Sequence, residues 1–234
     1  MSKATIEAYE QVRIAYPEYF KEATNYALVT EEEELSAFEA SADTTLGLVY
    51  ENSQLYYVVD LWKTTDGQYY PMPRTLYKDT LCGFVVLPVC GDKFVLNHEF
   101  SFGNREWNLE FPRIMTQPGM TIPEHLEAVV NYIGGKVLNT RYVGELYPDS
   151  GNTGGLMQVY MVDIDLAEEE QLNHTLVSYE ELKDMVVKGT INDVYSLSCL
   201  LKFICGEGFE EEDSIDLSKY ISEDESEVEA QDDV

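Results

Sequence analysis

The chain has 234 residues, of which 44% are hydrophobic and 12% aromatic, so it can form one large domain or a domain with additions and is not disordered throughout. Its formal charge of −29 comes from 44 acidic and 15 basic residues, and this excludes a broad nucleic-acid-binding surface, which requires basic side chains. No apolar run approaches the roughly 18 residues of a membrane span, and the first residues lack the basic and apolar regions of a signal peptide. We therefore expect a cytoplasmic protein that has neither a nucleic acid nor a membrane as a partner.

The first 45 residues predict a helical arm. Apolar residues recur at spacings of three and four over residues 4–26, which is typical of an amphipathic helix, and Pro17 is placed to break it in two. Four consecutive glutamates, residues 31–34, predict the start of a second helix that runs to about Ala40, because acidic side chains in a first turn suit the helix dipole.

From Leu46 the apolar period changes to two and predicts strands, with turns at residues 51–53, 66–67 and 91–92. A helix is expected over residues 123–133, and two more strands are expected within residues 136–166. Ser178 is predicted to be the N-cap of a helix that stops at Gly189. A closing apolar helix covers residues 192–205, with Asp193 near its start.

Residues 206–234 form an acidic tail with 13 acidic residues and one basic residue, Lys219, for a net charge of −12. Its few apolar residues do not offset the entropy cost of ordering, so we expect disorder there. We predict three regions: an N-terminal arm at residues 1–45, a main domain at 46–205 and the tail at 206–234. A basic protein that binds these acidic surfaces is a possible partner.

The four cysteines predict buried free thiols in a reducing compartment. None belongs to a Cys-x-x-Cys pair, and none has a His beside it with metal-ligand spacing. A zinc site or a reactive thiol is the alternative. The cysteines are Cys82, Cys90, Cys199 and Cys205.

The order of these elements, together with several short strings, resembles the Nudix hydrolases, in the branch that acts on ADP-ribose and related nucleoside diphosphates. The resemblance implies an α+β Nudix fold, an α/β/α sandwich around a mixed sheet, carrying the N-terminal arm and the acidic tail, and it implies a homodimer. The strings that carry it are "GFVVLPV" at 83–89, "WNLEFPR" at 107–113, "QPGMT" at 117–121, "VGELYPDSGNTGG" at 143–155 and "VSYEELKDMVVKGTINDVYSLSCL" at 177–200.

The Nudix motif itself is degenerate in this chain. In that family, its carboxylates hold Mg²⁺ or Mn²⁺ against the bridging phosphates. The ungapped match retains the frame at Pro112, Arg113, Val130 and Gly135 but lacks the motif arginine and all four motif acids. The resemblance therefore implies no catalytic residue and no metal, with Mg²⁺ or Mn²⁺ expected only if hydrolysis persists. The motif positions that lack the expected glycine, arginine and glutamates are Ile114, Met120, Ala128, Val129, Tyr132 and Ile133.

Other acidic residues could rebuild the metal site, and Glu124, Glu127 and Glu110 are the fallback catalytic candidates. Glu124 and Glu127 lie three apart and share a helix face, but we expect solvated acids on an ordinary helix, with Val129, Tyr132 and Ile133 facing the former pocket instead. His125, between them, is expected at the surface.

The ligand-binding candidates are Arg74, Glu110, Arg113 and Asp149, although a Glu110–Arg113 pair that only holds a strand end is at least as good an interpretation. Three functions stay open. The first is a non-catalytic Nudix-fold protein that binds a nucleotide-like ligand or a partner. The second is an active hydrolase of ADP-ribose-like nucleoside diphosphates with relocated metal ligands. The third is an acidic interaction module for a basic protein.

Overall fold

The computed structural model describes residues 3–21, 23–79, 81–166 and 174–206, so the predicted disorder of the tail lies outside the described residues. The chain divides into two compact units. Unit 1 comprises Met1–Cys82 and Tyr147–Met157, and unit 2 comprises Gly83–Leu146 and Gln158–Val234. The units are defined by contacts between residues, whereas the boundary predicted at residue 45 is defined by a change in the period of apolar residues. The two divisions are not equivalent, so the predicted domains stay a prediction.

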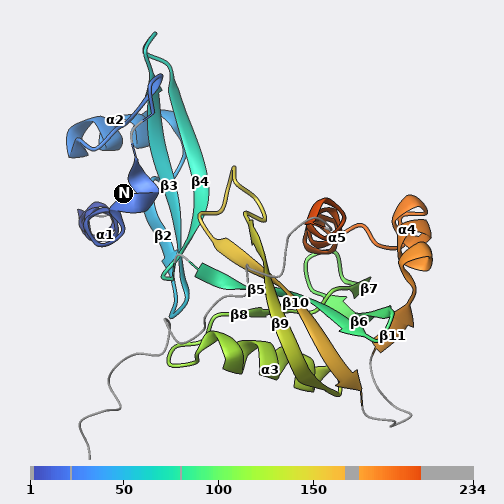
Figure 1. Cartoon of the computed structure of the whole chain (residues 1–234). Helices are drawn as coiled ribbons and strands as arrows, with labels where there is room; N and C mark the ends of the chain where they lie inside the picture. Colours follow the sequence, from blue (N-terminus) through green and yellow to red (C-terminus); the bar gives the residue numbers. More distant parts are fainter. Residues whose placement is uncertain (1–2, 22, 80, 167–173, 207–234) are drawn as a thin grey trace, which may run out of the picture. The chain divides into compact units, whose positions relative to one another are not determined.

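Unit 1 is built on a four-stranded sheet (Figure 1). Its long central strand β3 pairs antiparallel with β4 along one edge and with β2 and β1 along the other. The elements are α1 (Lys3–Ala15), the 3₁₀ helix η1 (Pro17–Phe20), β1 (Tyr26–Leu28), α2 (Glu32–Ala42), β2 (Gly47–Glu51), β3 (Leu55–Thr64) and β4 (Tyr69–Tyr77).

Both faces of this sheet are partly covered, because the side chains of β3 alternate between them. On one face, Tyr9 and Val12 of α1 pack with Val58 and Leu76. On the other face, Leu35 of α2 packs with Leu61 and with Leu46 and Val29 from the flanking loops.

The second sheet has seven strands in the order β11-β6-β5-β10-β9, with β7 paired to β6 and β8 paired to β5. Figure 1 shows α3 on one side of this sheet and α4 and α5 on the other. The elements are β5 (Leu81–Cys90), β6 (Lys93–Ser101), β7 (Glu106–Glu110), β8 (Arg113–Met115), α3 (Ile122–Tyr132), β9 (Gly135–Leu146), β10 (Leu156–Leu166), β11 (His174–Val177), α4 (Tyr179–Val187) and α5 (Val194–Gly206).

Most predicted elements are confirmed within a few residues. Three short strands were not predicted, because β1, β8 and β11 have three or four residues each, too few for a periodic pattern to reveal. The helix predicted over residues 4–26 ends at Ala15, since Pro17 starts η1 and Tyr26 starts a strand. Ser178 and Asp193 cap their helices as predicted, each accepting a hydrogen bond from a backbone N–H three residues later.

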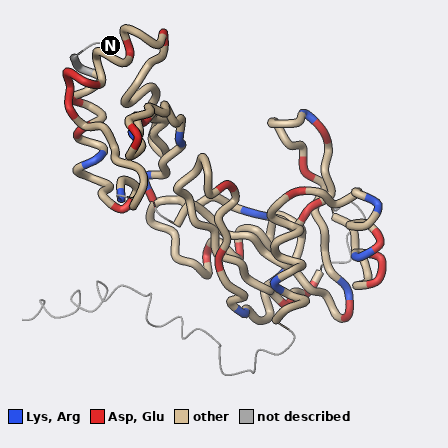
Figure 2. The backbone as a smooth tube through the Cα atoms, turned by 90° about the horizontal axis from the view of Figure 1, so that it is seen from above, with Lys and Arg blue, Asp and Glu red and all other residues tan. Residues whose placement is uncertain are grey.

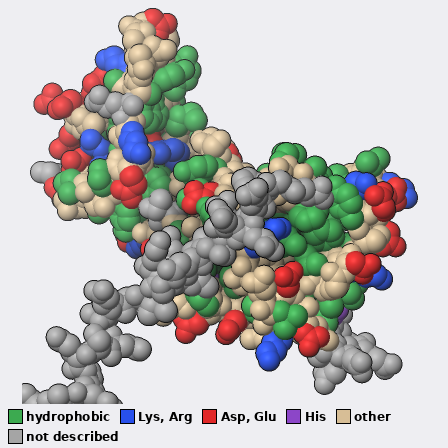
Figure 3. Space-filling model, viewed as in Figure 1, with side chains coloured by type: hydrophobic (Ala, Val, Ile, Leu, Met, Phe, Trp, Pro, Cys, Tyr) green, Lys and Arg blue, Asp and Glu red, His purple; other side chains and the backbone are tan. Residues whose placement is uncertain are grey.

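The surface reflects the composition. Figure 2 shows acidic residues along both units, and Figure 3 shows hydrophobic side chains exposed on both. The predicted burial of the cysteines is correct for Cys82 and Cys199, but Cys90 is half-buried and Cys205 is exposed. Within the described part of the chain, no helix is both long enough and apolar enough to cross a membrane.

Candidate functional site

Helix α3, which stands where the Nudix motif would place its metal ligands, is held by its cap and its apolar face. Thr121 caps the helix, and the Thr121 N–H in turn donates to Glu124 Oε2 at 2.7 Å. Val129 is 4% exposed and Ile133 is fully buried, and both belong to the core. The helix thus turns its apolar face into the core of unit 2, and the expectation that these positions face a former pocket stays a prediction.

The other degenerate positions lie in varied surroundings. Ile114 is in β8 opposite Phe84, and Met120 and Ala128 are half-buried. Tyr132 is 61% exposed, and its hydroxyl donates to Glu99 Oε2 at 3.4 Å. None of these side chains carries the carboxylate oxygen that Mg²⁺ requires.

The fallback ligands are not brought together. Glu124 belongs to the cap of α3, Glu127 is exposed, and Glu110 is buried in β7 beside Arg113. Among the residues that the structure describes, no three His, Cys, Asp or Glu side chains are grouped closely enough to hold a metal ion.

His125 is buried, with 2% of its surface exposed, and the prediction of a surface residue is wrong. Its Nε2 accepts from the backbone N–H of Gln117 at 2.9 Å, and its Nδ1 donates to the carbonyl of Thr121 at 2.7 Å. The ring packs on Phe84, with the centroids 5.0 Å apart. His125 therefore fastens the loop before α3 to the helix, a role that depends on how the loop folds back.

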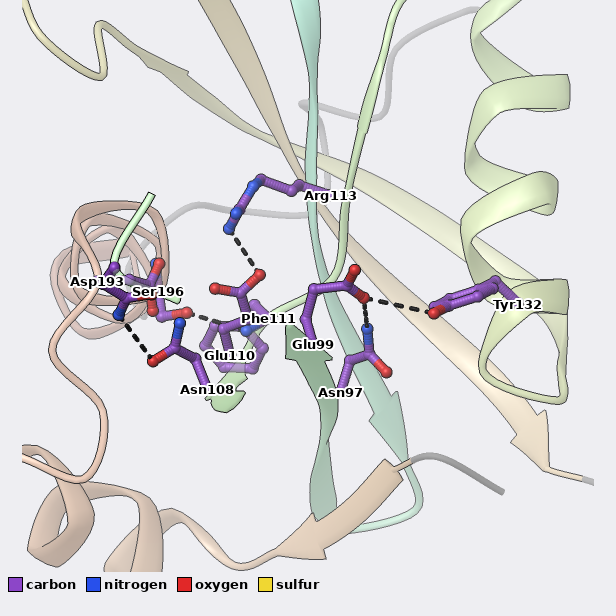
Figure 4. Close-up of polar contacts among 10 residues, drawn as sticks. Asn97, Glu99, Asn108, Glu110, Phe111, Arg113, Tyr132, Asp193 and Ser196 are labelled. Carbon is purple, nitrogen blue, oxygen red and sulfur yellow. Dashed lines mark hydrogen bonds and ion pairs between the residues drawn. The ribbon is translucent and has the colours of Figure 1, made fainter. Parts of the chain in front are cut away.

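The predicted pair of Glu110 and Arg113 forms in unit 2 (Figure 4). Arg113 Nη1 lies 2.7 Å from Glu110 Oε1, and its guanidinium lies over the ring of Tyr195. Burial raises the pKa of the Glu110 carboxyl, Arg113 opposes the rise, and Asp193 and Glu99 add to it. The carboxylate is thus a buried, partly compensated charge at the strand end.

Several polar residues around this pair were missed by the sequence reasoning. The Phe111 N–H donates to Ser196 Oγ at 2.9 Å, which ties β7 to α5, and Asn97 Nδ2 donates to Glu99 Oε2 at 3.0 Å (Figure 4). Ser196 and Asn97 are buried. A polar residue inside an otherwise apolar strand or helix was the only available signal, and it does not identify the partner.

Arg74 lies in unit 1 and is positioned by a buried acid. Its Nε donates to Asp60 Oδ2, the Tyr9 hydroxyl donates to Asp60 Oδ1, and Arg74 Nη1 donates to the carbonyl of Tyr19 at 2.8 Å. Asp60 is fully buried and Arg74 is partly exposed. The acid thus fixes the direction of the guanidinium, and the sequence reasoning missed both Asp60 and Tyr9.

A cavity of about 360 Å³ opens beside Arg74, within unit 1. The loop of residues 147–155 forms one wall, because the Thr75 N–H donates to the Asn152 carbonyl at 2.8 Å and the Gly154 N–H donates to the Thr75 carbonyl at 3.1 Å. The lining is two cations, one acid, two hydroxyl side chains, two tyrosines and two glycines, namely Arg74, Lys21, Glu18, Ser150, Thr153, Tyr19, Tyr147, Gly151 and Gly154.

Asp149 shapes this loop. Its Oδ1 accepts from the backbone N–H groups of Gly151 and Asn152 at 3.1 and 3.2 Å. The hydrogen bond from the Asn152 side chain contributes most to lowering the pKa of the Asp149 carboxyl. The structure thus brings Arg74 and the Asp149 loop together in unit 1, while Glu110 and Arg113 belong to unit 2.

A second, more apolar pocket of about 450 Å³ lies in the same unit, lined by Ala23, Tyr26, Trp62, Tyr70 and Met72. Trp62 pairs with Tyr70 across β3 and β4, and Met72 pairs with Asp60. Side chains two residues apart on a strand share a face, so Tyr70, Met72 and Arg74 share one face of the sheet. Met72 and Arg74 are separated by about 7 Å along that face.

Comparison with known proteins supports the fold. No family model matches the chain, and no curated protein matches it. A crystal structure of an ADP compounds hydrolase is similar, with a TM-score of 0.60 and 13% sequence identity over 80% of this chain and 98% of that protein. An identity this low shows the fold alone. The chain is a mixed α+β protein whose fold is similar to that of this hydrolase, which confirms the predicted fold at that level.

Proposed function

We propose that this protein binds a nucleotide-like ligand in unit 1 and does not hydrolyse it by metal catalysis. The observation that carries the proposal is the arrangement of two pockets on the four-stranded sheet. Cations and hydroxyls line the cavity beside Arg74, and aromatic side chains line the neighbouring pocket. Phosphate oxygens suit the first lining and a flat base suits the second.

Each side chain that lines the cavity has a definite role in the proposed binding. The Asp60 carboxylate holds Arg74 in place before any ligand arrives, so little side-chain entropy is lost on binding. Lys21 adds a charge and Ser150 a hydroxyl donor. The Thr153 hydroxyl donates to the Asp149 carbonyl at 3.0 Å and so holds the loop that forms one wall of the cavity. In a protein with a net charge of −29, such a pair of cations offers an anion a local site that the rest of the surface does not favour.

The proposed lack of hydrolysis is supported by the residues of α3. Val129 and Ile133 occupy core positions, and Glu124 is used in the helix cap. Turning these positions into a metal site requires carboxylates in the core, where an unpaired charge is costly. The similar ADP compounds hydrolase makes ADP-ribose a reasonable first probe.

The test is ligand-induced thermal stabilisation with ADP-ribose, measured on the full chain. A ligand at about 100 times its dissociation constant stabilises the folded state by about 2.7 kcal/mol. We expect the stabilisation to fall in Lys21→Met and Thr153→Val, which alter the cavity and leave the Asp60–Arg74 pair intact. Lys136→Met, an exposed lysine in unit 2, is the matched control. Equal stabilisation of all four proteins would contradict the proposed site, and no stabilisation by ADP-ribose or nucleoside diphosphate sugars would contradict the function.

A further inference from the structure

Helix α5 exposes an apolar stripe near the end of the described chain. Val194 is 46% exposed, Leu201 61% and Ile204 42%, and Cys205 is also exposed. Position 201 lies seven residues after 194, and positions 204 and 205 lie three and four residues after 201, so all four lie along one side of the helix. Figure 3 shows hydrophobic side chains gathered over this helix. We call Val194, Leu201, Ile204 and Cys205 the α5 stripe.

The opposite side of α5 already packs in unit 2, so the stripe is not needed to hold the helix. Cys199 and Leu200 are buried, and the Phe203 ring meets Phe94 with the centroids 5.2 Å apart. Contiguous exposed apolar surface of this kind marks a site of interaction. The helix is also unusual for this chain in its charge, because residues 194–206 contain one basic residue, Lys202, and no acidic residue.

The chain itself supplies a fitting occupant. After Gly206, where α5 ends, 28 residues remain (234 − 206). Four of the eight apolar residues of that tail fall in one segment, residues 215–221, which reads "IDLSKYI". This segment has one acid and one base, Asp216 and Lys219, and is therefore neutral, whereas "EEED" precedes it and "EDE" follows it.

The connection is long enough. Residues 207–214 separate α5 from the segment, and eight extended residues span at most about 29 Å. The 13 residues of α5 are about 20 Å long, so the segment can reach any part of the stripe. Because only eight residues join the two, their effective concentration is high, on the order of millimolar.

We propose that residues 215–221 dock on the α5 stripe, with Leu217, Tyr220 and Ile221 against Leu201 and Ile204. The acidic flanks then lie near Lys202 and away from apolar surface. A second copy of the chain is less suited to cover the α5 stripe. Residues 1–205 alone carry a net charge of −17 (−29 + 12), so two copies repel each other.

Cys205 lets this contact be measured, because its thiol belongs to the stripe. The rate of its modification by a disulfide reagent is followed in the full chain, with the labelled peptide identified by mass spectrometry. Burial raises the pKa of Cys82 to about 11 and raises the pKa of Cys199 as well, so these two thiols react slowly while the protein is folded.

We expect the Cys205 rate to rise roughly tenfold in the double variant Leu217→Asp, Tyr220→Asp, as expected when a local contact is lost. Val228→Asp, in the tail but outside the segment, is the control and should leave the rate unchanged. Equal rates in the wild type and the double variant would overturn the proposal. A wild-type rate that rises on dilution would also overturn it, because a second copy would then be covering the stripe.

Discussion

At the scale of single residues, Glu110 is a buried carboxyl whose pKa is raised by burial. A group with a raised folded-state pKa contributes stability below its unfolded pKa of about 4.3, and this contribution is lost as the pH rises through the folded pKa. Glutamine does not ionise, so Glu110→Gln does not lose this stability as the pH rises. We therefore expect the stability of the variant, relative to wild type, to increase as the pH rises above about 4.3, as measured by urea unfolding.

The control is Glu127→Gln, which neutralises an exposed carboxyl of the same unit. Its stability relative to wild type should stay nearly constant over the same range. If the two variants show the same pH dependence, burial does not perturb Glu110 in the way described.

His125 illustrates a second effect at this scale. His125→Phe keeps a ring against Phe84 but removes the acceptor for the Gln117 N–H and the donor to the Thr121 carbonyl. We expect a loss of about 1–3 kcal/mol in the free energy of unfolding. Glu127→Gln should change it by less than about 0.5 kcal/mol, and a His125→Phe effect equally small would show that the two bonds do not stabilise the fold.

At the scale of elements, the loop of residues 147–155 passes very close to its neighbours. A Cβ at Gly155 would lie 2.5 Å from Tyr77 Cδ2 and 2.7 Å from Cys82 Sγ. Gly155→Ala should therefore destabilise the protein by about 1–3 kcal/mol in denaturant unfolding. Gly151→Ala tests the same loop without the clash, since its nearest contact is Asp149 Oδ1 at 3.4 Å. Comparable losses in both variants would refute the steric argument.

The sequence predicts the longer elements well because their patterns are local. The 3.6-residue period, the two-residue period and the capping residues each depend on a few neighbouring positions. The Thr121 to Glu124 capping box was equally visible as a Thr-x-x-Glu string and explains Glu124 better than a metal site does.

The sites depend on contacts that no local pattern encodes. Thr75 meets Asn152 and Gly154 across more than seventy residues, and that pairing creates one wall of the cavity. The burial of His125 depends on how residues 117–121 fold back on α3. Arg74 and Arg113 were identified as candidates, but Asp60, which fixes Arg74, was not, because an acid in an apolar strand does not reveal its partner.

At the scale of the whole molecule, the fold resembles that of an ADP compounds hydrolase, and charge sets the conditions for any partner. The homodimer, the basic protein partner and the cytoplasmic location stay predictions. Acidic residues dominate both parts of the chain: the tail has a net charge of −12, and residues 1–205 have a net charge of −17. An anionic ligand in unit 1 therefore meets long-range repulsion that salt screens, and we expect its affinity to depend less steeply on salt than it would at a basic surface.

The central claim is that a nucleotide-like ligand is bound and left intact. The most direct measurement incubates the full chain at high concentration with ADP-ribose and Mg²⁺, and separately with Mn²⁺, and follows the nucleotides by chromatography. We expect ADP-ribose to be recovered unchanged from samples in which it stabilises the protein. Product formation that a chelator abolishes, and that Glu124→Ala or Glu127→Ala removes, would contradict it and show a working metal site on α3.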